Sequence, residues 1–180
     1  MKLLGRFLAL LLTISVVPAH AGDFTIFGGF QHQGHLTLGN AAAGAGTFIF
    51  NPRNFGVYGG RLGLGLGGIP FLGQEHSLAI APNFIDTNSK AVLYNSNLLI
   101  QAPLISIKPY ATLGLGFVHS SGNTVSAIGT KFAFNSGGGV KFALFGPLGG
   151  RIDVRDYRIL SVQGQTLNVL EVSAGASFSF

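Results

Sequence analysis

The sequence contains neither cysteine nor tryptophan, and only 9% of its residues are charged. Without cysteine, the chain can form no disulfide, no thiolate metal site and no cysteine nucleophile. The few basic residues form no cluster of the kind that binds nucleic acid, so the pI of about 9.9 says little about function. A chain without disulfides must gain its stability from other interactions, above all from its backbone hydrogen bonds.

Long hydrophobic runs are missing beyond residue 22, where glycine, asparagine, serine or charged residues interrupt every apolar stretch before it could form a membrane-spanning helix. The mean hydropathy is nevertheless +0.47. High hydrophobicity without long runs is difficult to reconcile with a soluble protein. It is typical of a chain whose strands present one face to lipid and the other to a polar lumen.

The first 21 residues have the features of an export signal. Lys2 and Arg6 supply positive charge, residues 7–17 are almost entirely apolar, and Ala19-His20-Ala21 is a small-x-small cleavage pattern. The alternative is a membrane-spanning helix, which would need a longer run of roughly 20 residues. We therefore expect cleavage after Ala21.

The last eleven residues, 170–180, alternate strictly between apolar side chains and small or polar ones. Such a period of two predicts a strand whose two faces have different surroundings. In a soluble domain the apolar face would pack on a core. In a membrane barrel it would face lipid, and the terminal Phe180 would lie at the interface.

Seven earlier segments alternate in the same way, and each has about the ten residues that a tilted strand needs to cross a bilayer. The eight predicted strands are 23–33, 54–66, 75–84, 91–101, 108–118, 130–142, 149–158 and 170–180. The pattern predicts an all-β fold, an eight-stranded antiparallel up-and-down transmembrane β-barrel. The expected domains are a signal peptide at 1–21 and the barrel at 22–180.

The connections between these segments alternate in character. The outer loops are predicted at 34–53, 86–90, 120–129 and around 161–165. The periplasmic turns, which contain proline, are predicted around 67–74, 102–107 and 145–147. Eight strands leave an interior about wide enough for side chains to fill, so we expect a barrel without an open pore.

The strand faces opposite the apolar ones carry most of the charges. The predicted lumen charge cluster comprises Arg61, Glu75, Lys108, Lys131, Lys141, Arg151, Asp153, Arg155 and Glu171. Because an unpaired charge in a narrow interior is costly, both signs should interleave as ion pairs that brace the barrel. The alternative is an ion-conducting path, in which the excess of basic residues would favour anions.

No constellation predicts a catalytic, cofactor or metal site. In a strand, Glu75-His76-Ser77 would place His76 on the face opposite its neighbours, which prevents a relay. His119-Ser120-Ser121 lies at a strand end and could approach lipid head groups, but no acidic residue follows nearby to orient the histidine. His32 and His35 lack carboxylate or thiol neighbours, which favours an interfacial polar cap over a metal site.

Three motifs give the chain a family resemblance: Lys108-Pro109-Tyr110-Ala111-Thr112-Leu113-Gly114-Leu115-Gly116, Gly137-Gly138-Gly139-Val140-Lys141-Phe142 and Gly150-Arg151-Ile152-Asp153-Val154-Arg155-Asp156-Tyr157. From about residue 22 to residue 180, the chain resembles the bacterial outer membrane β-barrel superfamily, small eight-stranded barrels related to the transmembrane domain of outer membrane protein A. The resemblance implies a glycine-rich sixth strand, an Arg-x-Asp-x-Arg-Asp-Tyr seventh strand and an eighth strand that ends in phenylalanine. It also implies that Phe178 and Phe180 belong to the signal read by the barrel assembly machinery.

From these observations we expect a monomeric integral protein of the cell outer membrane of a Gram-negative-type bacterium. Its expected role is structural or interactive, with a filled lumen, the 34–53 loop as contact surface, no enzymatic activity and no cofactor. The expected partners are outer membrane lipids and the barrel assembly machinery, and no nucleic acid. The alternatives are a narrow porin-like channel, a lipid-modifying enzyme that uses His119 or Ser120, and a soluble periplasmic calycin-like barrel.

Overall fold

The computed structural model describes residues 22–34, 36–38, 48–50, 53–67, 69–85, 87–102, 104, 106–122, 128–162 and 164–180. The strands in these ranges are β1 (Gly22–Gln33), β2 (Leu36–Leu38), β3 (Phe48–Phe50), β4 (Asn54–Gly65), β5 (Leu72–Pro82), β6 (Lys90–Gln101), β7 (Ile107–Ser121), β8 (Gly129–Phe145), β9 (Leu148–Val162) and β10 (Gln165–Ser179). The described part of the chain contains no helix that is long and apolar enough to span a membrane. The predicted signal peptide, residues 1–21, lies outside the described residues.

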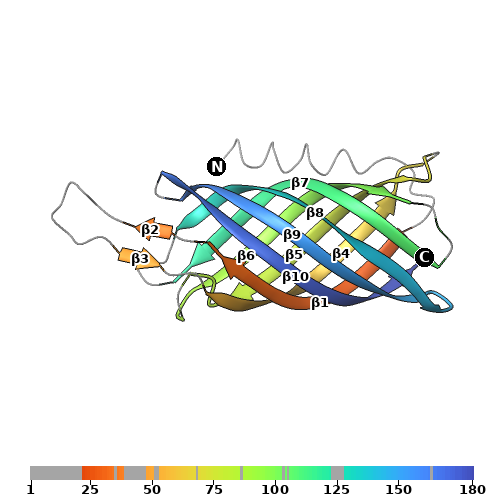
Figure 1. The fold of residues 1–180 in the computed structure, drawn as a ribbon, viewed down its shortest axis with the longest axis horizontal. Helices are drawn as coiled ribbons and strands as arrows, with labels where there is room; N and C mark the ends of the chain where they lie inside the picture. The colour runs from red at the N-terminus through yellow and green to blue at the C-terminus, as the bar shows by residue number, and fades with distance from the viewer. Residues whose placement is uncertain are drawn as a thin grey trace.

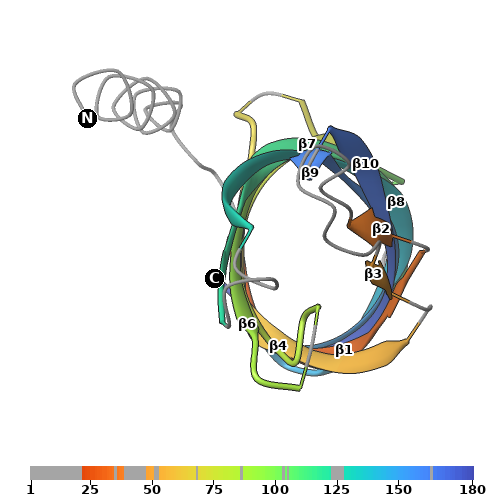
Figure 2. The same cartoon turned by 90° about the vertical axis from the view of Figure 1, so that its left-hand side faces the viewer.

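Eight strands close into a barrel in the order β1, β10, β9, β8, β7, β6, β5, β4 (Figures 1 and 2). Every neighbouring pair is antiparallel, and each barrel strand pairs with the next one along the chain. β1 and β10 close the ring through a register that runs from Asp23↔Ser179 to Gln33↔Val169. β2 and β3 form a separate two-stranded sheet beyond one end of the barrel (Figure 1). The predicted eight-stranded all-β barrel is therefore confirmed.

The two ends of the barrel differ. At one end, the backbone N–H of Gly22 donates to the Phe180 carbonyl at 2.8 Å, and the Phe180 N–H donates to the Gly22 carbonyl at 2.9 Å. We call this the termini end, and it also holds the connections between β4 and β5, β6 and β7, and β8 and β9. The opposite end, here the loop end, holds the other connections and the β2–β3 sheet (Figure 1).

Polarity is inverted between the inside and the outside of this barrel. Arg61, Arg151 and Arg155 are among its largest fully buried side chains, whereas Phe30 is 72% exposed and Ile26 is 65% exposed. Burial alternates from residue to residue along β9 and β10, as the pleat of a strand requires. Proteins in water expose arginine and bury phenylalanine. The outer surface is therefore suited to lipid and the inner one to polar groups.

The loop-end half of the interior is a hydrophobic core, which the sequence did not predict. Phe84 and Ile85, in the connection between β5 and β6, turn into this core and are fully buried. The Phe84 ring packs edge-on against Phe55, with 5.4 Å between the ring centroids. The backbone N–H of Ile85 donates to the Ser89 hydroxyl at 2.9 Å, which holds the turn in place. Most of the side chains buried in this half of the lumen are apolar.

The termini-end half of the interior is more open. A cavity of about 570 Å³ opens there, and its lining includes Asp23, Lys108, Lys141 and Ser177. The interior thus changes along the barrel axis from an apolar core, through a charged middle, to a cavity at the termini end.

The predicted strand limits need correction at several points. β5 begins at Leu72 and not at residue 75, because hydrogen bonds from Ile69 N to Leu66 O and from Leu72 N to Ile69 O close a tight turn before it. It ends at Pro82, before Phe84, because Asn83 adopts a positive φ of 57° and redirects the chain. β7, β9 and β10 have 15 residues each and β8 has 17, more than the ten predicted, since these strands continue past the bilayer-spanning length.

Candidate functional site in the barrel interior

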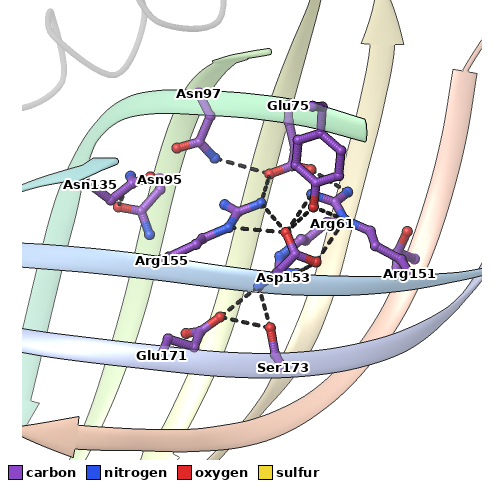
Figure 3. Close-up of polar contacts among 12 residues, drawn as sticks. Arg61, Glu75, Asn95, Asn97, Asn135, Arg151, Asp153, Arg155, Glu171 and Ser173 are labelled. Carbon is purple, nitrogen blue, oxygen red and sulfur yellow. Dashed lines mark hydrogen bonds and ion pairs between the residues drawn. The ribbon is translucent and has the colours of Figure 1, made fainter. Parts of the chain in front are cut away.

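Three arginines and three carboxylates meet in the middle of the barrel (Figure 3). β9 supplies Arg151, Asp153 and Arg155 at alternate positions, because residues two apart on a strand point to the same face. β4, β5 and β10 supply one residue each, Arg61, Glu75 and Glu171. All six are at most 1% exposed. The formal charges in this cluster, which we call the central network, balance to zero.

Asp153 is the acceptor that joins most of the central network. Its Oδ2 lies 2.7 Å from Arg61 Nη1 and 2.8 Å from Arg151 Nε, and its Oδ1 lies 3.0 Å from Arg155 Nη2. The hydroxyl of Tyr110, on β7, also donates to Oδ1. One carboxylate therefore connects strands β4, β7 and β9 through charge-assisted hydrogen bonds.

Glu75 connects β5 to β9 on the opposite wall. Its Oε2 lies 2.5 Å from Arg151 Nη1, and its Oε1 lies 2.7 Å from Arg155 Nη2. The side-chain amide of Asn97, on β6, donates to Glu75 Oε1 at 3.2 Å. Two guanidinium groups and one amide thus compensate a carboxylate that is removed from water.

Glu171 is the third carboxylate and connects β10 to β4. Its Oε1 lies 2.6 Å from Arg61 Nη2 and accepts a hydrogen bond from the Ser173 hydroxyl at 3.1 Å. The amide of Gln31, on β1, donates to its Oε2 at 2.7 Å. The Arg61 guanidinium also lies over the Phe27 ring, 3.7 Å from the centroid, which adds a cation–π contact.

The three lysines predicted for the lumen lie apart from the central network. Lys141 pairs with Asp23 at the termini end, with 2.6 Å between Nζ and Oδ2. Lys108 is exposed and faces Lys141 directly across the β7–β8 register, where both line the cavity. Lys131 is half-buried near the loop-end start of β8. The structure therefore assembles Arg61, Glu75, Arg151, Asp153, Arg155 and Glu171 and leaves the lysines at the two ends.

Sequence reasoning missed several polar members of the interior. Asp23 and Gln31 lie on the inward-facing side of β1, as the alternation of that strand indicates, but the lumen charge cluster predicted from the sequence included neither of them. Tyr110 and Asn97 occupy inward-facing positions of β7 and β6, where the alternation of each strand points them into the lumen. Their partners Asp153 and Glu75 come from distant parts of the chain, and only the closed barrel brings them together.

The candidate catalytic residues do not form relays in the structure. His119 is exposed on the outer face and its Nδ1 lies 2.8 Å from Thr130 Oγ1, whereas Ser120 is buried on the inner face. His76 also faces outward, where its Nδ1 lies 2.9 Å from the Tyr94 hydroxyl, while Glu75 points inward.

His32, on the outer face, lies 2.7 Å through Nδ1 from the Asn54 side-chain oxygen. His35 lies outside the described residues. In the ranges that the structure describes, no three His, Asp or Glu side chains group together as metal ligands would.

The central network has one clear physical consequence. Moving an unpaired charge into such an interior costs several kcal/mol, so each member depends on its partners. Because these partners come from strands on different sides of the barrel, the ion pairs cross the lumen and occupy its centre. The described side chains of this site are thus paired with one another across the lumen.

Comparison with known proteins agrees with the fold of the barrel. The family model of the outer membrane protein β-barrel domain matches residues 7–180. The chain therefore belongs to this family of outer membrane β-barrels. A search of curated proteins finds no match.

Several solved structures are similar in fold. Neisserial surface protein A superposes with a TM-score of 0.63 at 15% sequence identity, covering 87% of this chain and 97% of that protein. The N-terminal β-barrel domain of Pseudomonas aeruginosa OprF gives a TM-score of 0.61 at 13% identity, covering 90% and 98%. The outer membrane enzyme PagL gives 0.52 at 16% identity, covering 85% and 97%. At these identities the likeness extends to the fold alone.

Proposed function

We propose that this protein is a non-conducting outer membrane barrel of structural or interaction type, which holds its loops at the cell surface. The observation that carries the proposal is the filled interior, in which the central network and the core around Phe84 and Ile85 occupy successive levels of the lumen. A solute would have to displace both to pass through.

The same proposal includes the orientation of the barrel. The termini end, with its short connections, lies in the periplasm, and the loop end, with the β2–β3 sheet, faces outward. Phe178 is 47% exposed and Phe180 is 63% exposed at the termini end, which supports their assignment to the signal read by the assembly machinery. The segment that carries β2 and β3 is the proposed contact surface for an external partner.

Cysteine labelling tests this placement in a chain that has no cysteine of its own. Ser121→Cys introduces a thiol at an exposed position of the loop end, and Ser106→Cys introduces one at an exposed position of the termini end. In intact cells, a membrane-impermeant maleimide should label the Ser121→Cys variant. The Ser106→Cys variant should react only after the outer membrane is permeabilised.

Fractionation of the same cells completes the experiment. Both variants should be recovered with the outer membrane and should shift on a gel between unboiled and boiled samples. Recovery in the soluble periplasm without a heat-dependent shift would refute the proposal. Labelling of the Ser106→Cys variant in intact cells, in place of the Ser121→Cys variant, would show that the barrel has the opposite orientation.

A further inference from the structure

A series of polar side chains marks the loop-end limit of the apolar outer face. The exposed residues in this series come from seven strands of the barrel, one from each, and they are His32, Asn54, Lys90, His119, Thr130, Arg158 and Asn168. Toward the termini end, the outer face of β9 continues with Val154 and Ile152, both about half exposed. Polar residues that follow an apolar band at one level indicate where the band meets the head groups of a membrane.

Positive charge is unevenly distributed along this polar series. Lys90 begins β6 and Arg158 lies on β9, whereas the described outward positions of β1, β4, β5 and β10 carry no lysine or arginine. In the same described region, Asp156 is the one acidic residue on the outer face. It lies 3.3 Å from Arg158 Nε, and the Arg158 side chain remains 68% exposed. Among the described outward-facing strand positions near the loop end, those of β6–β9 therefore carry the lysine and the arginine.

Three phenylalanines lie on the outer face between the two cations. Phe117 and Phe132 are opposite each other in the β7–β8 register, with ring centroids 5.6 Å apart, and Phe134 packs against Phe132 at 5.1 Å. Phe134 is in turn opposite Arg158 in the β8–β9 register. These rings form an aromatic surface on the termini-end side of His119 and Thr130, where acyl chains would begin.

We propose that this β6–β9 sector binds a phosphate-bearing lipid of the outer leaflet. Lys90 and Arg158 contact its phosphates, and His119 and Thr130 offer hydrogen-bonding groups between them. Phe117, Phe132 and Phe134 contact its acyl chains. The proposal rests on the orientation given under the proposed function, which puts the loop end in the outer leaflet.

The dimensions and the charges favour this occupant. Neighbouring strands are about 4.8 Å apart, so the arc from β6 to β9 spans on the order of 14 Å, enough for a headgroup with more than one phosphate. Each basic residue at a membrane surface contributes about 1 kcal/mol to binding an anionic lipid. Arg158 keeps its terminal guanidinium nitrogens available for bidentate contact with phosphate while its Nε contacts Asp156.

Lipid retention measured by native mass spectrometry tests the proposal. The full-length barrel is reconstituted in phosphatidylcholine nanodiscs that contain either a bisphosphorylated glucosamine lipid or the same lipid after phosphatase treatment. The wild type should retain the phosphorylated form selectively. The Lys90→Ala/Arg158→Ala double variant should bind it about 30-fold more weakly, since two contacts of about 1 kcal/mol are lost.

Two variants serve as controls, and a heat-shift gel confirms that each one folds. Lys108→Ala removes an exposed lysine from the termini end and should leave retention unchanged. Arg158→Lys, combined with an intact Lys90, should weaken binding less than Arg158→Ala does, because the charge remains while the bidentate contact is lost. Inorganic phosphate alone should not compete, since it lacks the acyl chains that contact the aromatic surface.

Three results would overturn the proposal. Equal retention of both lipids by the wild type would show that the barrel does not recognise the phosphates. An equal loss in Lys108→Ala would reduce the effect to general attraction, and competition by inorganic phosphate would make the site one for the free ion. Failure of the orientation itself would be visible separately, as absence of surface labelling in the Ser121→Cys variant.

Discussion

Arg155 on β9 and Glu75 on β5 come from opposite walls of the barrel, yet their side chains meet with 2.7 Å between Nη2 and Oε1. In the ring order, three strands separate β9 from β5 in either direction. The pair therefore links two opposite walls of the barrel across the lumen. Its contribution differs from that of a surface ion pair, because both side chains are fully buried.

Removing one partner of this ion pair should destabilise the barrel strongly. Glu75→Ala leaves Arg151 and Arg155 with only Asp153 as a carboxylate partner, and breaking a buried ion pair in this way costs about 3–5 kcal/mol. Urea unfolding in detergent micelles, followed by circular dichroism, measures the loss. Asp156→Ala, which breaks an exposed pair with Arg158, should cost less than about 1 kcal/mol. Equal costs for the two variants would contradict the proposed brace.

Glycines inside the strands should differ sharply in their tolerance of alanine. At Gly139, an added Cβ would lie 2.5 Å from the Tyr110 hydroxyl and would also overlap the Ile152 carbonyl. Such overpacking costs about 1–3 kcal/mol. At Gly56, on the outer face, no atom lies within 4 Å of an added Cβ, so Gly56→Ala should be neutral or slightly stabilising. The same urea titration compares the two, and a Gly139→Ala variant as stable as Gly56→Ala would show that the inner wall is not closely packed.

The apolar core at the loop end should depend on Phe84. Phe84→Ala removes a fully buried ring that packs against Phe55, and the cavity left behind should cost about 3–5 kcal/mol. Phe84→Leu keeps most of the volume and should cost less than about 1.5 kcal/mol. Thermal heat-shift gels and urea midpoints report both values. A Phe84→Ala variant with wild-type stability would mean that the 83–89 turn does not seal the barrel.

A charge placed on the outer face should be costly only in the middle of the apolar band. Val154→Arg puts a guanidinium at a half-exposed position of β9 that we assign to the bilayer interior, where the expected cost is about 2–4 kcal/mol. Thr130→Arg, at the loop end, should cost about 0–1 kcal/mol. Reversible folding into phosphatidylcholine vesicles measures the difference. Equally small costs for the two variants would place both residues in water and contradict the membrane-spanning barrel.

Strand alternation carried most of the fold prediction. The two faces of each barrel strand have different surroundings, so polar and apolar side chains alternate along the sequence. This alternation was enough to assign Arg61, Asp153 and Glu171 to the inner face from the sequence alone. Strand limits were less accurate where a turn is made by hydrogen bonds, as at Leu66 and Ile69, because glycine and proline there indicate only a break.

Other features depend on the closed barrel and were not predictable from local pattern. Phe84 and Ile85 look like the end of an alternating strand, and their burial follows from the backbone reversal at Asn83. The lysines were grouped with the arginines by parity alone. Their distance along the strands places Lys108 and Lys141 at the termini end, where Asp23 and the cavity take the place of the central network.

A lumen sealed by the central network and the apolar core leaves no path for ions through the barrel. Single-molecule current recording across a planar lipid bilayer tests it most directly, with a heat-shift gel to show that the reconstituted protein is folded. We expect no discrete conductance steps from the wild-type protein, even at high protein load. Reproducible unitary steps from the folded wild type would contradict it and would make the protein a narrow channel.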